Sequence, residues 1–109
     1  MGCRFALPAI TLAMVLGIGW TPTHASDQNR TCSAMSKIAG TTMKARQNSV
    51  ALETTIQIYS EETTPQAYKY LRPIILKAYE YPAMRTPKHK HHAITEFKNS
   101  VMLDCLRLY

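Results

Sequence analysis

Residues 86–106, TPKHKHHAITEFKNSVMLDCL, carry the pattern of a complete α-helix together with one of the cysteines of the chain. Thr86 followed by Pro87 is a typical helix start, because the threonine hydroxyl caps the first turn and proline fits the first helical position. Apolar side chains then recur every three or four residues, at Ile94, Phe97, Val101 and Cys105. This spacing predicts a helix that buries one face and ends near Leu106.

Two similar segments precede it. The first begins after Asp27 or Thr31 and runs to Gln47, with apolar residues at helical spacing: Cys32, Met35, Ile38, Ala39 and Met43. We expect it to end at Asn48-Ser49, because asparagine adopts the left-handed conformation that closes many helices. Another helix starts at Thr64-Pro65 and presents one face: Tyr68, Leu71, Ile75 and Tyr79. Pro73 inside this helix predicts a kink or two abutting helices, and Pro82 ends it.

Between these two helices lies a shorter apolar stripe with a less certain pattern, formed by Val50, Leu52, Ile56 and Tyr59. The β-branched pair Thr54-Thr55 lowers its helix propensity. Both a helix and a strand therefore remain open for this segment.

Residues 1–25 have the layout of a secretory signal peptide. Arg4 supplies the positive charge, residues 5–20 the apolar run, and residues 23–25 a small-residue site ahead of Ser26. The run contains Pro8 and falls short of the ~20 apolar residues that a membrane span needs. We expect a cleaved leader, a single helical domain over residues 26–109 without a membrane span, and a periplasmic or secreted location.

Cys32 and Cys105 are the two cysteines outside this leader, near the two ends of the domain. In an exported protein such a pair predicts a disulfide, although free thiols or an intermolecular bond are alternatives. The bond would bring the start of the first helix to the end of the last, as in an antiparallel pair. The fold class predicted is therefore all-α, a small bundle of three to five helices stapled by one disulfide.

The charge of the chain favours an acidic partner. Thirteen Lys and Arg stand against seven Asp and Glu, a formal charge of +6. Part of the excess lies around the last helix, at Arg85, Lys88, Lys90 and Lys98. We expect this basic surface to bind an acidic protein or an envelope component such as a lipid head group or lipopolysaccharide phosphate. Nucleic acid is a poor fit for an exported protein.

The same helix offers a metal-site hypothesis. His89, His92 and Glu96 stand at i, i+3 and i+7, so they share a helix face and are residue types that bind Zn²⁺ or Cu²⁺. The neighbouring Lys88 and Lys90 repel a cation. The simpler interpretation is a solvated helix start with at most adventitious metal.

Arg46 falls on the apolar stripe of the first helix. A buried guanidinium needs a partner, and Glu80 is the candidate for an ion pair. Alternatively, the arginine reaches outward and stabilises the C-terminal end of the helix.

No sequence pattern in the chain indicates an enzyme. There is no phosphate-binding glycine loop, no G-x-S-x-G and no H-E-x-x-H motif. The leading hypothesis is a non-enzymatic interaction protein of the periplasm. A metal-binding protein and an acid-stress chaperone that opens as its histidines become charged are the alternatives.

Three stretches together resemble a set of short exported bacterial and phage-borne proteins. They are residues 43–47 (MKARQ), residues 78–82 (AYEYP), and residues 93–99 (AITEFKN) followed by Cys105. The resemblance implies an exported helical protein, encoded by a host or a prophage, and transfers no active site. Those proteins carry glycine soon after the Arg-Gln pair, where this chain has Asn48-Ser49.

Overall fold

The computed structural model describes residues 23–108, with side chains from residue 27 onward, and every regular element in this range is a helix. The helices are α2 (Thr23–Gln47), α3 (Leu52–Glu62), α4 (Pro65–Tyr79) and α5 (Pro87–Arg107). The all-α prediction is thereby confirmed, and the segment for which helix and strand were both open forms α3. The predicted leader lies outside the described residues, except that residues 23–25 form the first turn of α2.

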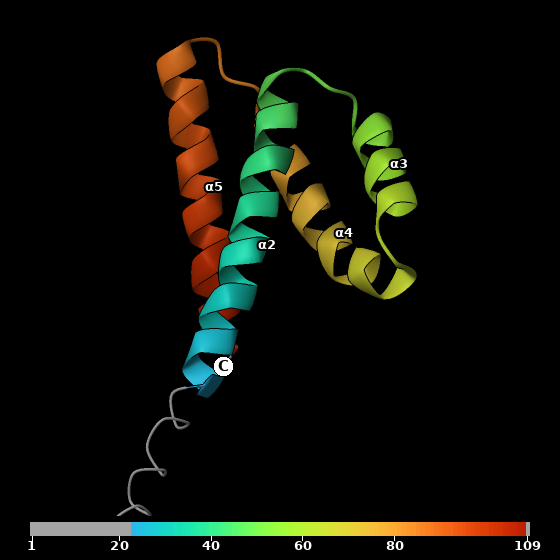
Figure 1. Ribbon diagram of the computed structural model, residues 1–109. Coiled ribbons are helices and arrows are strands. Elements are labelled where there is room, and N and C mark those ends of the chain that lie inside the picture. The colour runs from blue at the N-terminus through green and yellow to red at the C-terminus, as the bar shows by residue number, and fades with distance from the viewer. Residues whose placement is uncertain (1–22, 109) are drawn as a thin grey trace, which may run out of the picture.

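Helices α2 and α5 are the longest in this range and run antiparallel, side by side (Figure 1). The predicted disulfide joins their ends, with the Cα atoms of Cys32 and Cys105 5.5 Å apart. Both cysteines are buried, and Met35 Sδ lies 3.8 Å from Cys105 Sγ. The first and last helices therefore form one covalently closed pair.

Helix α4 packs against α2, and α3 packs mainly against α4 (Figure 1). The core lies where α2, α4 and α5 meet and consists of Ala39, Met43, Ile74, Ala78, Phe97 and Val101. The ring of Tyr81 meets Phe97 edge-on, with centroids 5.4 Å apart. Because three helices contribute to this core, burial of their apolar faces holds the bundle together.

The starts of α4 and α5 follow the sequence signals. The Thr64 hydroxyl accepts a hydrogen bond from the Ala67 amide at 3.1 Å, and the Thr86 hydroxyl accepts one from His89 at 3.2 Å. Pro73 lies inside α4, which continues as one helix and ends at Tyr79. The alternative of two abutting helices is therefore wrong, and α4 ends three residues before Pro82.

Helix α2 ends in a hydrogen-bonded turn that reverses the chain toward α3. The Val50 amide donates to the Ala45 carbonyl at 2.9 Å, and the Ser49 amide donates to Arg46 at 3.1 Å. This pairing is the Schellman motif, which needs one residue with left-handed backbone. That residue is Ser49, with φ of 64°, rather than the asparagine that the sequence favoured.

Candidate functional site

Gln47 connects the end of α2 to the segment that joins α4 and α5. Its side chain is 1% exposed, and its amide nitrogen donates to the Pro82 carbonyl at 3.0 Å. Its side-chain oxygen accepts from the Met84 amide at 2.7 Å. Lys90 Nζ donates to the backbone carbonyl of Gln47 at 2.5 Å. Lys90, predicted to belong to a binding surface, instead satisfies a carbonyl in the last turn of α2 and is half-buried.

Arg46 also binds this segment. Its Nε donates to the Tyr81 carbonyl at 2.7 Å, and its guanidinium carbon lies 5.7 Å from the centre of the Tyr79 ring. These two contacts replace the ion pair expected with Glu80, which does not form between the described side chains. A carbonyl dipole and an aromatic face stabilise the cation here, so no carboxylate is required.

The candidate metal ligands do not converge. Within residues 27–108, no three or more His, Cys, Asp or Glu side chains are arranged to hold a metal ion. His89 and Glu96 are seven residues apart on one helix, or about 10 Å along its axis. The Nδ1 of His89 is also 2.7 Å from the Thr86 hydroxyl at the helix cap. His89, His92 and Glu96 therefore form an exposed helix face, as in the simpler interpretation, and metal binding by these residues stays a prediction.

The predicted basic surface divides into separate parts. Arg85 and Lys88 are exposed at the start of α5, whereas Lys98 is ten residues further along, about 15 Å away by helix rise. With Lys90 engaged at the end of α2, no single patch unites the four residues. The charge of Lys98 therefore has to be considered with its neighbours on α2.

Lys98 lines a hollow with two lysines that the sequence analysis missed. Lys37 and Lys44 of α2 and Lys98 of α5 line an open surface hollow of about 400 Å³, together with Gly40, Thr41 and Ile94. We call this hollow, with its three lysines, the lysine trough. Lys37, Gly40 and Lys44 stand at i, i+3 and i+7 and therefore share one face of α2. That spacing is the sequence signal for the α2 side of the trough.

Gly40 determines where Lys98 lies. A Cβ atom at this position would come within 2.8 Å of Lys98 Cδ and 3.0 Å of its Cγ, so the lysine stem lies directly against the glycine. Lys98 thus crosses α2 between the levels of Lys37 and Lys44. Glycine inside a helix costs about 1 kcal/mol relative to alanine. The absence of a side chain at Gly40 is what lets Lys98 approach α2 this closely.

A second hollow adjoins the lysine trough. It measures about 350 Å³ and shares Lys37 and Lys98 with the first, and its other lining residues are Ser33, Ser36, Asn99 and Met102. The Ser36 hydroxyl donates to the Lys98 backbone carbonyl at 3.3 Å, which connects the two helices at this level. Neither hollow has an acidic residue in its lining.

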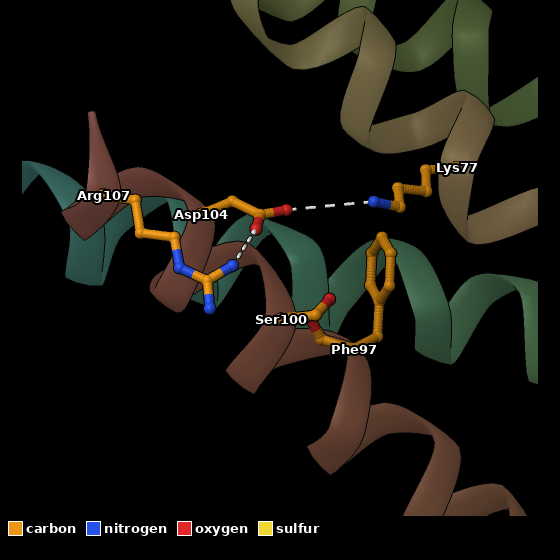
Figure 2. A network of polar contacts seen from close by, with 5 residues as sticks. All are labelled: Lys77, Phe97, Ser100, Asp104 and Arg107. Carbon is orange, nitrogen blue, oxygen red and sulfur yellow. Dashed lines mark hydrogen bonds and ion pairs between the residues drawn. The ribbon is translucent and has the colours of Figure 1, made fainter.

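Asp104 of α5 already has two cationic partners. Figure 2 shows Asp104 of α5 between Arg107 of the same helix and Lys77 of α4, at 3.8 Å from each. In the range where side chains are described, no ion pair includes a trough lysine. Two ammonium groups about 10 Å apart repel by roughly 0.4 kcal/mol in water. The trough therefore concentrates positive charge that an anion would neutralise.

Comparisons with known proteins add no relative: no family model, curated protein or solved structure matches this chain. The resemblance to short exported proteins therefore stays a prediction. Over the described range, no helix has both the length and the apolar character needed to cross a membrane.

Proposed function

We propose that the protein is a non-enzymatic, exported interaction protein that binds an acidic partner through the lysine trough. The observation that carries the proposal is the convergence of Lys37, Lys44 and Lys98 on one hollow that no acidic residue lines. A cluster of like charges attracts oppositely charged partners and speeds their association.

The location proposed is the periplasm or the extracellular space. The Cys32–Cys105 disulfide supports it, because such bonds persist in oxidising compartments. The leader pattern of residues 1–25 points the same way. Acidic proteins and anionic envelope components are both encountered there.

The test compares two variants that lose the same charge in different places. In the trough variant, Lys37, Lys44 and Lys98 are replaced by Gln. In the matched control, the exposed residues Lys69, Arg72 and Lys88 are replaced by Gln. Binding of each protein to two anionic polymers, polyglutamate and inorganic polyphosphate, is measured by fluorescence anisotropy.

We expect the wild type to bind at least one polymer, with a Kd that rises about tenfold or more between about 50 and 200 mM NaCl. The trough variant should lose most of this binding, and the matched control should keep most of it. If both variants weaken equally, net charge alone explains the binding and the trough is not the site.

A further inference from the structure

The lysine trough and its neighbouring hollow are lined by an unusual excess of hydrogen-bond donors. Three lysines line the first hollow, and two of them, Lys37 and Lys98, also line the second together with Ser33, Ser36 and Asn99. Each ammonium offers three donors and no acceptor. A ligand that satisfies these groups must therefore present many acceptor oxygens close together.

Phosphate meets this requirement better than carboxylate. A phosphate group presents its acceptor oxygens in a tetrahedral arrangement, three with a charge of about −1.5 to −2 in a monoester and two with one charge in a polyphosphate interior or a phosphodiester, whereas the two oxygens of a carboxylate lie in one plane. The planar fork of arginine binds both carboxylate and phosphate, and no arginine lines either hollow, so recognition here falls to lysine, which is also a common phosphate ligand. Lysine acts as a point charge, which suits the tetrahedral phosphate.

The lining also lacks the usual features of a protein-binding site. Energetically dominant contacts in protein interfaces come mainly from Trp, Tyr and Arg, usually in apolar pockets. The apolar residues in these hollows are Ile94 and Met102, one in each, and neither hollow contains an aromatic residue. A phosphorylated ligand that lies along the seam between α2 and α5 fits this lining better.

We propose that the lysine trough binds the phosphate groups of its partner, and that Gly40 is the positioning residue that allows Lys98 to complete the site. The inference rests on the proposed function, since it specifies the chemistry of the acidic partner. Gly40 acts by leaving space for the Lys98 stem, which lies against α2 between the positions of Lys37 and Lys44.

The first experiment compares inorganic polyphosphate with polyglutamate of matched total charge, by titration against the wild type. We expect polyphosphate to bind at least tenfold more tightly, and the difference to disappear in the trough variant. Equal affinities would overturn the phosphate preference and leave the proposed function standing. Binding of both polymers that is insensitive to the trough variant would overturn both proposals.

A double-mutant cycle tests the role of Gly40. Gly40→Ala should lower the affinity for polyphosphate several-fold without lowering the thermal unfolding midpoint, because alanine has the higher helix propensity. In the Lys98→Ala background, Gly40→Ala should not change the affinity for polyphosphate, because the Lys98 side chain that it would displace is already absent. An equal loss of affinity in both backgrounds would show that Gly40 does not act through Lys98.

A third measurement identifies the source of the phosphate. Sedimentation with phosphatidylglycerol vesicles is compared with sedimentation with neutral phosphatidylcholine vesicles. Trough-dependent binding to the anionic vesicles assigns the site to lipid head groups, and binding to polyphosphate alone assigns it to a soluble phosphate polymer. Failure of the wild type to bind either phosphate source would overturn the inference.

Discussion

Ser49 is the residue at which the chain leaves α2, and its φ of 64° is the only positive value among the non-glycine residues described. In this conformation the Cβ atom approaches the following carbonyl, which costs an L-residue about 1–2 kcal/mol. Glycine avoids this contact but loses more backbone freedom on folding, by roughly 0.5–1 kcal/mol. Glycine at position 49 should therefore make the folded protein more stable than the native serine does.

We expect Ser49→Gly to raise the free energy of unfolding by about 0.5–1 kcal/mol, which corresponds to a few degrees in Tm for a domain of this size. Urea and thermal unfolding would measure it. Asn48→Gly is the matched control, since Asn48 has no positive φ and should gain nothing. Equal effects of the two substitutions would contradict the assignment of Ser49 as the left-handed residue of the turn.

At the scale of the element, α3 depends on a tyrosine from its neighbour. The Tyr79 hydroxyl of α4 donates to the Val50 carbonyl at 2.8 Å and lies 2.8 Å from the Thr55 hydroxyl. Thr55 is the buried residue of α3, whereas Leu52 and Ile58 are exposed and Ile56 and Tyr59 are half-buried. Because no apolar residue of α3 is fully buried, we expect these polar contacts to contribute to the attachment of α3.

Replacing Tyr79 by Phe should therefore loosen α3 selectively. The change leaves the Val50 carbonyl and the Thr55 hydroxyl without their partner, at a cost of about 1–2 kcal/mol. Hydrogen exchange should show faster exchange of α3 amides and smaller changes in α2 and α5. Tyr70→Phe is the control, because Tyr70 is 71% exposed. Uniform acceleration throughout the bundle would argue against a local attachment.

The starts of α4 and α5 were predictable because they follow local rules, whereas α2 begins at Thr23 and not, as expected, after Asp27 or Thr31. The Thr-Pro pairs at residues 64–65 and 86–87 contain the whole signal, and both cap the helices as expected. The end of α2 was less predictable, since Asn48 and Ser49 are both plausible there and the tertiary turn selects the serine. Thr55 lowered the expected helix propensity of α3, although it is the residue that the fold buries.

The sequence pairs the MKARQ and AYEYP stretches through an Arg46–Glu80 ion pair, but the contacts that join them are different ones. Met43 and Ala78 share the core, Arg46 donates to the Tyr81 carbonyl, and Gln47 donates to Pro82. The two stretches thus join the end of α2 to the segment after α4. Their side chains were predictable one at a time, but hydrogen bonds to backbone carbonyls far away in the sequence have no local pattern.

At the scale of the whole molecule, the lysine trough exists only because α2 and α5 lie antiparallel in one register. The disulfide sets one end of that register, and Lys90 binding to the Gln47 carbonyl sets the other. Lys98 therefore meets Gly40 midway between them. Closeness in sequence groups Lys98 with Arg85, Lys88 and Lys90, because neighbours in sequence are visible without the register and neighbours across helices are not.

The disulfide should contribute much of the stability of this small bundle. It closes a loop of 73 residues, and chain-entropy arithmetic for a loop of this length gives about 4 kcal/mol. Small domains are stable by only about 5–15 kcal/mol in total. We therefore expect the double variant Cys32→Ala/Cys105→Ala, and the reduced wild type, to unfold at a much lower urea concentration than the oxidised protein.

The double variant is also the control for the reductant, which should not change the urea concentration at which this variant unfolds. Both sulfur atoms lie within the α2–α5 pair, next to Met35, so the loss of covalent closure should first free the start of α2 and the end of α5. Amides in those two turns should then exchange faster than those of the core around Phe97. If the oxidised and reduced proteins unfold at the same urea concentration, packing alone fixes the register, and the trough does not depend on the bond.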